Sequence, residues 1–525
     1  MSSTTLRPSL APYESYPIHK LLERAAEKHG DRVAVIDGSK SFTYNEMALL
    51  SSRFASVLAN SGLEKGDRVG ILAPNCVEFV IAFYGIAQMG AVVSTINSGY
   101  REREIAHQVK DSGCKTLIVH ESLNEVLTEA LLLAGETPKI IAITAENHST
   151  GSFWDLVEES EPFGGCEIDP DNDLAALPYS SGTTGLSKGV MLTHFNLVSN
   201  VEQLVGLKEA SQMGPEDIVL VHLPLFHIYG MNILMNGCIA VGATQVMMGR
   251  FDMVEFLELI EHEGITVLFT VPPVGLGLTQ FPGVSDRDLS KLRLAFFGAA
   301  PLSGELQERI SEVLGCPVIQ GYGLTETSPL ANSDFAEPGL TRPGSIGPAA
   351  PDTEEKIVDV EDSDKELPAG ETGELMIRGP QVMIGYFNNP EATAETITED
   401  GWLHTGDIAR ADDEGYVWIL DRKKELIKYK GFQVPPAELE GLLVEHPDVS
   451  DAAVIGKEDE ESGEIPKAFV VRSAGSEISS EEVMEFVAER VSTFKQVREV
   501  EFVDSIPKNP SGKILRRLLR DPGNG

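Results

Sequence analysis

Short apolar runs alternate with longer helix-like stretches in the first third of the chain, and this alternation restricts the fold more than any other feature. Residues 33–36 and 69–73 have the length and composition of buried strands. Residues 44–60 and 76–89 follow them with the length of helices. This order predicts helices that cover a largely parallel sheet. A similar alternation over about 173–321 extends the prediction of an α/β fold.

The pattern changes between residues 354 and 421, where short strand-like segments are separated by turns rich in Gly, Pro and Asp. This pattern predicts a small β-rich subdomain. A basic cluster follows at 422–430, and a compact βα pattern continues to the end. A chain of 525 residues is too long for one ordinary core. We therefore predict a large N-terminal domain over 1–423, which includes the β-rich subdomain, and a small, mobile C-terminal α+β domain over 424–525.

Charge excludes one class of partner. The chain carries 42 Lys and Arg against 81 Asp and Glu, a net charge of −39 at pH 7. Such a chain repels the phosphate backbone, so nucleic acid is not an expected partner. The acidity has two readings: adaptation to high salt, in which counterions screen the self-repulsion, or an acidic and very soluble surface.

We expect the protein to tolerate molar KCl and to lose stability in dilute buffer. Counterions offset the repulsion among its excess carboxylates, and that screening weakens as the salt is diluted. Thermal unfolding measured over a range of KCl concentrations tests this expectation. Equal or greater stability in dilute buffer would contradict it.

The cysteines and the apolar segments indicate the compartment. The five cysteines are few, odd in number and widely spaced, which argues against a disulfide framework or a zinc site. The N-terminus lacks the pattern of a signal peptide, no apolar run reaches about 18 residues, and the last residues carry no peroxisomal or lipidation signal. We expect a cytoplasmic protein without a membrane span, either a monomer or a homodimer.

The strongest local signal is the segment Ser-Ser-Gly-Thr-Thr-Gly-Leu-Ser-Lys-Gly at 180–189, directly after the apolar run 174–179. Glycines let backbone N–H groups surround an anion, hydroxyls add donors and Lys188 adds a positive charge, which suits a triphosphate. A Walker A loop is excluded, because Ser187 precedes the lysine and Gly189 follows it. The alternative is a flexible linker, but linkers rarely lie between a buried strand and a helix.

Further motifs follow in a fixed order. They are Gly-Ala-Ala-Pro at 298–301, Gln-Gly-Tyr-Gly-Leu-Thr-Glu at 320–326, Gly-Trp-Leu-His-Thr-Gly-Asp at 401–407, Asp-Arg-Lys-Lys-Glu-Leu-Ile-Lys-Tyr-Lys-Gly at 421–431, and Pro-Ser-Gly-Lys at 510–513. With them the chain resembles the adenylate-forming superfamily of acyl-CoA synthetases, peptide-synthetase adenylation domains and beetle luciferases. Residues 224–229 and 430–440 look most like 4-coumarate–CoA ligases.

The resemblance implies an AMP-forming acid–CoA ligase. Such an enzyme uses ATP and Mg²⁺ to convert a carboxylic acid to its acyl-adenylate, releases pyrophosphate, and then passes the acyl group to coenzyme A with release of AMP. Two alternatives stay open within the superfamily: an enzyme that loads a carrier-protein thiol, and a luciferase-like enzyme. A third is a catalytically idle binding protein with the same fold.

Attack of a carboxylate on the α-phosphorus of ATP brings two anions together, so the site needs positive charge and a metal ion. The resemblance assigns Glu326 and Thr184 to Mg²⁺, Asp407 and Arg422 to the ribose, and Lys513 to the adenylation step. The plain alternatives are a surface glutamate on a turn and a solvated charge near the C-terminus. The predicted nucleotide-binding residues are Ser180, Ser181, Gly182, Thr183, Thr184, Gly185, Lys188, Gly298, Ala299, Ala300, Pro301, Gln320, Gly321, Tyr322, Gly323, Thr325, Asp407, Arg422 and Lys513.

The second half-reaction in this superfamily follows a rotation of the small domain, about a hinge that falls here at Lys424. The rotation would withdraw the adenylation lysine and bring Lys428 to the adenylate, so Lys428 is also predicted to be catalytic. The residues predicted to contact coenzyme A are Lys430, Gly431 and Gln433. His227 is the fifth predicted catalytic residue; it would gate or shape the acyl site, and the alternative is an ordinary buried histidine.

The predicted acyl pocket is an apolar slot. Its residues, carried over from the superfamily, are Ile228, Tyr229, Ile233, Phe296, Ala299, Gly321, Gly323, Pro329 and Leu330. The chain departs here from plant 4-coumarate ligases, since Ile233 replaces a small polar residue, Phe296 replaces a methionine, and Thr-Ser-Pro-Leu at 327–330 replaces Ala-Gly-Pro-Val. These changes weaken the case for a hydroxylated cinnamate and admit an apolar aryl acid or a medium- or long-chain fatty acid.

Overall fold

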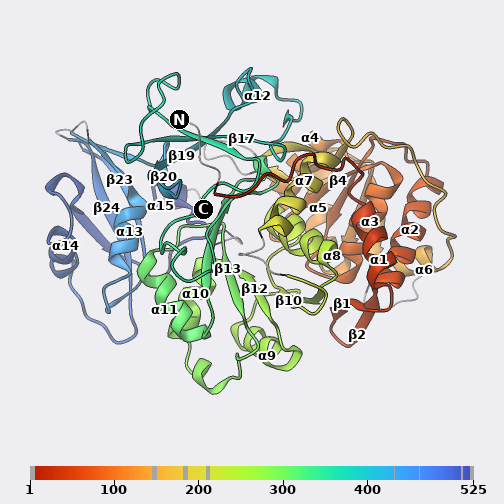
Figure 1. The fold of residues 1–525 in the computed structure, drawn as a ribbon, viewed down its shortest axis with the longest axis horizontal. Coiled ribbons are helices and arrows are strands. Elements are labelled where there is room, and N and C mark those ends of the chain that lie inside the picture. Colours follow the sequence, from red (N-terminus) through yellow and green to blue (C-terminus); the bar gives the residue numbers. More distant parts are fainter. Residues whose placement is uncertain are drawn as a thin grey trace.

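A computed structural model gives the fold of the chain (Figure 1). It describes residues 6–144, 151–180, 187–207, 213–430, 432–459, 462–509 and 512–520, without the side chains of Gln433 and Arg517. Two large sheets with their helices form most of the molecule. A four-stranded sheet lies at the top of the view, and a separate unit of sheet and helices lies at the left.

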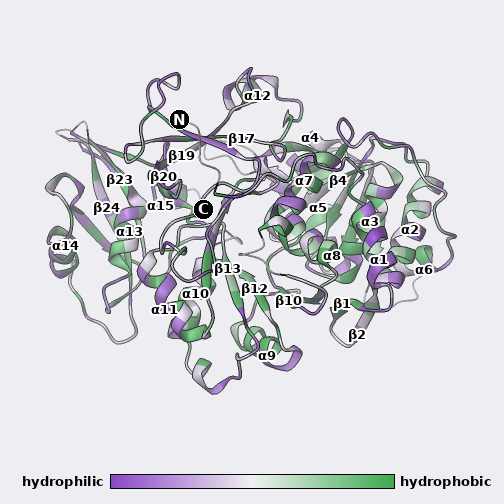
Figure 2. Ribbon diagram, in the orientation of Figure 1, coloured by the Kyte–Doolittle hydropathy of each residue, from purple (hydrophilic) through white to green (hydrophobic). Residues whose placement is uncertain are grey.

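The first large sheet joins segments that are distant in sequence. Its strands lie in the order β15 (Leu330–Ser333), β14 (Val318–Gly323), β13 (Leu294–Phe297), β12 (Val267–Thr270), β10 (Ile218–Val221), β11 (Thr244–Met247), β1 (Val33–Asp37) and β2 (Lys40–Thr43). The inner pairs are parallel, and β15 and β2 add antiparallel edges. The inner strands β12 and β13 are coloured as hydrophobic in Figure 2, as expected for strands covered on both faces.

The second large sheet has the order β18 (Gly385–Tyr386), β9 (Lys188–Thr193), β7 (Leu174–Ala176), β4 (Val92–Ile96), β3 (Arg68–Leu72), β5 (Thr116–His120) and β6 (Lys139–Ile143), and β8 (Tyr179–Ser180) pairs with β9. The strands from β7 to β6 pair in parallel, and β9 runs antiparallel to its neighbours. The expectation of helices on a largely parallel sheet is confirmed. One detail differs: residues 181–186 connect two strands, β8 and β9, and the helix begins only after β9.

Helices cover these two sheets, and their apolar faces form the main core. They are α1 (Lys20–His29), α2 (Tyr44–Asn60), α3 (Val77–Met89), α4 (Glu102–Ser112), α5 (Asn124–Ala134), α6 (Phe153–Glu158), α7 (His194–Gly206), α8 (Gly237–Val241), α9 (Met253–Glu263), α10 (Pro272–Gln280) and α11 (Gly304–Leu314). Helix α3 is apolar around most of its circumference because it packs inside the core. In the part of the chain that the structure describes, no helix is both long and apolar enough to cross a membrane.

The β-rich region forms an antiparallel sheet in the order β16 (Glu354–Val358), β17 (Thr372–Arg378), β19 (Leu403–Ala411) and β20 (Val417–Arg422), with α12 (Pro390–Thr396) nearby. The C-terminal sheet has the order β22 (Phe432–Val434), β21 (Ile427–Tyr429), β24 (Gly463–Arg472) and β23 (Val449–Asp459), and β25 (Glu499–Phe502) pairs with β24. Its helices are α13 (Pro436–Leu443), α14 (Ser480–Ala488) and α15 (Arg516–Arg520). The C-terminal unit has an apolar core of its own, whose buried residues run from Ile427 to Val497. The domain boundary at 423/424 itself stays a prediction.

Candidate active site

A cavity of about 1260 Å³ lies where the large sheets, the β-rich sheet and the C-terminal unit meet. Strands β4, β8, β13 and β14 contribute to its wall from the large sheets, and β18 and β20 close another side. The segment from Lys508 to Arg516 enters it from the C-terminal unit. Residues from nearly the whole length of the chain therefore share one site.

The nine residues predicted for the acyl pocket all line this cavity. The hydroxyl of Tyr229 donates to the backbone carbonyl oxygen of Phe296 (3.2 Å), which ties the Tyr229 side chain to β13. A Cβ atom on Gly321 would collide with the Phe296 ring, and one on Gly323 would collide with the carbonyl of Pro329. Glycine at these two positions therefore lets the Phe296 ring and the Pro329 backbone approach the main chain closely.

The wall containing Tyr229 includes a π-helix over Tyr229–Asn236. Such wide turns are rare and occur often at functional sites. Its start depends on Gly230, where a Cβ atom would overlap the carbonyl of Pro224. Ile233 lies within the π-helix and is buried, with its side chain at the cavity.

A second part of the cavity is polar, and Tyr322 and Arg422 line it. The hydroxyl of Tyr322 donates to Oδ2 of Asp407 (2.5 Å), and Nε of Arg422 lies 2.7 Å from Oδ1 of the same carboxylate. Burial raises the pKa of Tyr322, and the carboxylate of Asp407 adds to this effect. Burial opposes the charge of Arg422, but the neighbouring Asp407 holds its pKa above the usual value. The carboxylate of Asp407 is thus held in one orientation by a hydroxyl and a guanidinium.

Glu326 reaches the cavity from the short helical turn after β14. It is 8% exposed, and its Oε1 accepts a hydrogen bond from the hydroxyl of Tyr386 (2.8 Å). The ammonium of Lys188 lies 4.8 Å from the centre of the Tyr386 ring. Lys188, Tyr386 and Glu326 therefore form a connected row along one wall.

Glu326 fits a magnesium ion of the kind that accompanies a nucleotide. Mg²⁺ keeps several waters and is bound by one or two carboxylates together with phosphate oxygens of the substrate. Within the described ranges no group of three or more His, Cys, Asp and Glu side chains forms a metal centre, so the nucleotide would have to complete the coordination. Thr184, the other predicted ligand, lies outside the described residues.

Lys513 enters the cavity from the C-terminal unit with a charge opposite to that of a nucleotide. Lys508 and Arg516 line the cavity as well, but they pair with Asp451 and Glu440. The backbone N–H of Lys513 donates to Oδ1 of Asn509 (2.8 Å), which holds the turn that carries it. Burial, and then the positive charge of Arg422, lowers its pKa from 10.5 to about 8, against the opposing effects of Asp407 and Glu326. Its ammonium therefore lies close to the groups predicted to hold the nucleotide.

His227 also faces the cavity. Its Nδ1 accepts the backbone N–H of Tyr229 (3.2 Å), so the proton of the neutral ring is on Nε2. Burial, and to a smaller extent the nearby Lys513, lowers the pKa of His227 to about 4. At neutral pH the ring is uncharged and offers an N–H donor to the cavity.

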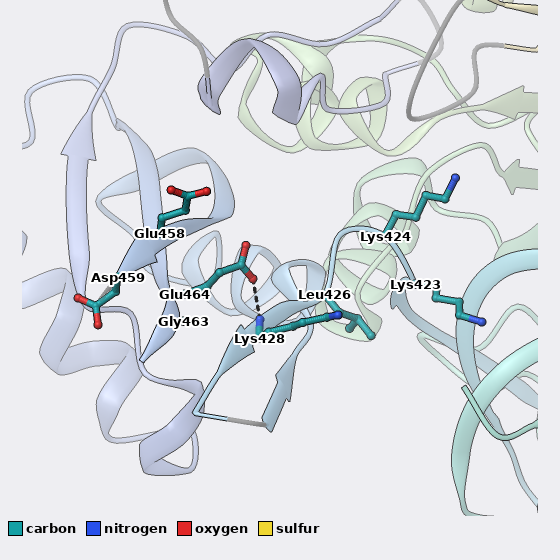
Figure 3. Close-up of a pocket in the computed structure, with 8 residues that line it drawn as sticks. All are labelled: Lys423, Lys424, Leu426, Lys428, Glu458, Asp459, Gly463 and Glu464. Atoms are coloured by element: carbon teal, nitrogen blue, oxygen red, sulfur yellow. Dashed lines mark hydrogen bonds between the residues drawn. The ribbon is translucent and has the colours of Figure 1, made fainter. Parts of the chain in front are cut away.

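Some predicted residues lie elsewhere. Of the described residues predicted for the nucleotide, Ala300, Pro301, Gln320 and Asp407 do not line the cavity. The amide of Gln320 instead bonds to the backbone of Leu302 and to Gln307, and Asp407 contacts Tyr322 and Arg422, which do line the cavity. Lys428 and Lys430 also lie outside it, on the hairpin β21–β22. Figure 3 shows Lys428 beside Glu464, with its backbone N–H donating to Oε2 of that carboxylate (2.7 Å).

Several predicted residues cannot be placed. Ser181, Gly182, Thr183, Thr184, Gly185 and Gly431, and the side chain of Gln433, lie outside what the structure describes. Their assignment to the phosphates and to coenzyme A stays a prediction. The ends of the first segment, Ser180 and Lys188, both line the cavity.

The structure adds residues that the sequence patterns did not single out. Tyr386 bonds to Glu326, and Glu374 accepts from Lys423 (2.9 Å) beside the predicted hinge. Both line the cavity, yet each has a partner about 50 or more residues away in the sequence, so no spacing or motif marks it. His107 and Asp111 of α4 line the cavity as well, near Ser180 and Lys188.

Comparison with known proteins agrees with this geometry. The family model described as AMP-binding enzyme matches residues 22–387, and that described as AMP-binding enzyme C-terminal domain matches 438–513. A 4-coumarate–CoA ligase of Pinus taeda is 44% identical, over 98% of this chain and 96% of its own. An anthranilate CoA ligase, AuaEII, solved with anthranoyl-AMP, has a TM-score of 0.90 at 27% identity, over 97% of each chain.

MatB from Rhodopseudomonas palustris is similar in two states. The ATP-bound structure has a TM-score of 0.88 and the apo structure 0.78. In both comparisons the identity is 31%, with 97% of this chain and 99% of the other covered. The arrangement of this chain is therefore closer to the nucleotide-bound state of that protein than to its apo state.

Proposed function

The chain belongs to the AMP-binding enzyme family, and from this premise we propose that it is an AMP-forming acid–CoA ligase. It first joins a carboxylic acid to the α-phosphate of ATP with loss of pyrophosphate, and then transfers the acyl group to the thiol of coenzyme A with loss of AMP. One observation carries the proposal: Lys513, from the end of the chain, faces the same cavity as Glu326 and Arg422.

The residues have distinct tasks in the first step. Asp407 accepts hydrogen bonds from the ribose, in an orientation that Arg422 and Tyr322 maintain. Lys513 places its ammonium beside the reacting phosphate, where negative charge grows during the attack. No base is required, because the attacking carboxylate is already ionised, and the low pKa of His227 fits a neutral N–H donor that shapes the acyl site. Bound Mg²⁺, held by Glu326, would neutralise phosphate charge.

The second step requires a different arrangement of the C-terminal domain, over 424–525. Lys428 lies outside the cavity, beside Glu464, while Lys513 occupies it. We propose that rotation about Lys424 exchanges the two lysines, so that one cavity serves both half-reactions. The greater similarity to the ATP-bound state of MatB supports reading the present arrangement as the adenylating one.

The substrate that the cavity suits best is an apolar aryl acid. The aromatic rings of Tyr229 and Phe296 line the cavity, and the Phe296 ring lies close against Gly321, an apolar aromatic wall that favours a planar ring. The relatives named for coumarate and anthranilate agree with this choice. A medium- or long-chain fatty acid is the second candidate, because buried Ile233 makes the wall more apolar.

Two assays test the function. Acid-dependent exchange of pyrophosphate into ATP reports the adenylate, and CoA-dependent release of AMP reports the thioester. Both should be measured with benzoates, cinnamates and fatty acids of short, medium and long chain. Exchange without any CoA-dependent AMP release would favour a carrier-protein loading or luciferase-like enzyme, and no exchange with any acid would favour an idle binding protein.

Phe296→Ala should lengthen or broaden the range of accepted acids. The side chain is 3% exposed and forms a wall against Gly321, so its removal opens space beside the acyl group. The expected shift in selectivity is about 1–3 kcal/mol, as for modest changes in an apolar pocket. It is measured as the ratio of kcat/KM between a longer and a shorter acid. An unchanged specificity profile in the folded variant would remove Phe296 from the pocket.

Adenylation should weaken at high pH. Burial lowers the pKa of Lys513 to about 8, so the ammonium is lost as the pH rises through that value. The kcat/KM for ATP in pyrophosphate exchange reports the free enzyme, and it should fall about tenfold for each pH unit above pH 8. Lys513→Arg keeps its charge and should be slower but free of this decline. The same alkaline fall in both proteins would contradict the assignment.

A further inference from the structure

Helix α4 contacts both ends of the 181–186 segment through two side chains one turn apart. His107 and Asp111 are four residues apart and therefore lie on the same face of the helix. The hydroxyl of Tyr179 donates to Oδ2 of Asp111 (2.6 Å), and Nε2 of His107 lies 2.9 Å from the carbonyl oxygen of Ser187. Tyr179 belongs to β8 and Ser187 directly precedes β9, so each end has its own contact.

In the hydrogen bond between His107 and Ser187, the histidine is the donor. A carbonyl oxygen only accepts, so Nε2 of His107 must carry the hydrogen. The distance is ideal for an N–H···O hydrogen bond. The imidazole therefore acts here as a donor to the backbone, whether or not Nδ1 is protonated.

The two contacts support each other. The rings of His107 and Tyr179 meet edge to face, with centroids 6.4 Å apart at 88°. Across the β8–β9 pair, the Tyr179 ring covers Gly189, where a Cβ atom would lie 3.2 Å from ring carbon Cζ. Lys188 is thus held on both sides, through the carbonyl before it and the glycine after it.

The position of α4 does not depend on this segment. Gln108 is fully buried, and its amide donates to Oγ of Ser94 (3.1 Å) and to the carbonyl of Thr95 (2.9 Å) in β4. At the end of the helix, Nε of Arg68 in β3 donates to the carbonyl of Ser112 (2.7 Å). The helix is therefore fixed to the sheet and provides a rigid support.

A displacement of β9 would also move the side chains that contact Glu326 at the cavity. Lys188 packs over the ring of Tyr386, and the hydroxyl of Tyr386 donates to Glu326. A row of direct contacts thus connects α4, β9 and the carboxylate predicted to hold magnesium.

We propose that His107 and Asp111 are positioning residues for the nucleotide: they hold β8 and β9, the strands that place Ser180 and Lys188 at the cavity where the triphosphate would bind. The inference rests on the proposed function and deepens it by adding support for one substrate, ATP. It concerns adenylation only, because coenzyme A and a preformed adenylate bring no triphosphate to this wall.

The test compares His107→Ala, His107→Gln and His107→Asn in the full-length protein. The alanine variant should raise the KM for ATP in pyrophosphate exchange about 3- to 10-fold, the effect of losing one neutral hydrogen bond. Glutamine places an amide N–H near the former Nε2 and should stay within about twofold of wild type. Asparagine is too short and should behave like alanine.

Asp111→Ala tests the other contact and should raise the KM for ATP to a similar extent. In all of these variants the KM for the acid, and the rate of thioester formation from a supplied acyl-adenylate, should change by less than about twofold. Lys110→Ala is the matched control, because Lys110 is exposed on the same helix. Its KM for ATP should equal that of wild type.

Equal KM values for ATP in wild type and His107→Ala would overturn the inference, as would a parallel loss of both half-reactions. If circular dichroism shows that an alanine variant is unfolded, the test rests on His107→Gln and His107→Asn. Equal KM values for ATP in these two variants would overturn the inference. If the wild-type protein shows no pyrophosphate exchange with any of the acids tested, the proposed function is overturned, and the inference with it. If the wild type exchanges pyrophosphate normally and the variants keep its KM for ATP, only the inference is overturned and the proposed function stands.

Discussion

Lys513→Ala should lose acid-dependent ATP–pyrophosphate exchange by on the order of 10²-fold or more, which is comparable with deleting one key electrostatic group. The ammonium lies in the cavity beside Arg422, Asp407 and Glu326, where little water competes for it. Its removal leaves the charge that develops on the phosphates without this partner. The exchange rate with saturating acid and ATP measures the effect.

The same variant should still convert a supplied acyl-adenylate to acyl-CoA at close to the wild-type rate. In the proposed mechanism Lys513 has left the cavity by then, so its side chain has no task in that step. Major unfolding is not expected, because the lysine is on a turn at the cavity edge, and circular dichroism can check this. Equal losses in both half-reactions would contradict a role limited to adenylation.

Lys428→Ala should show the opposite pattern. Adenylate should form normally, while thioester formation should slow by on the order of 10²-fold, since the variant lacks the group proposed to face the adenylate after rotation. Its exposed position beside Glu464, outside the cavity, is the reason we expect adenylation not to need it. Single-turnover measurements with CoA and preformed adenylate isolate the step.

Lys457→Ala is a matched control for Lys428→Ala. Lys457 is exposed on β23 of the same sheet, where its ammonium pairs with Glu499 (2.5 Å). Its loss removes one exposed positive charge from the C-terminal unit, as Lys428→Ala does, and should leave both half-reactions unchanged. If Lys513→Ala and Lys428→Ala lose the same half-reaction to the same degree, the rotating-domain mechanism is wrong for this chain.

The sequence was sufficient to predict the local elements. Helix α2 has the predicted bounds of 44–60, and strands β1 and β3 lie within one residue of the apolar runs at 33–36 and 69–73. Periodicity and length determine such elements, because burial of one face is a property of neighbouring residues. The division into two sheets was not predicted. β1 pairs with β11, more than 200 residues later, and no local pattern specifies such a partner.

The candidate site, too, was predicted from the sequence only in part. Ordered motifs predicted residues for phosphate, ribose and acyl recognition, because each contact needs a particular chemistry at a short spacing. The tertiary structure decided which of them meet: Lys513 enters the cavity, Gln320 instead braces the backbone at Leu302, and Lys428 stays outside. Single residues such as Tyr386 and His107 had no motif, because their partners come from distant segments that only the folded chain brings within hydrogen-bonding distance.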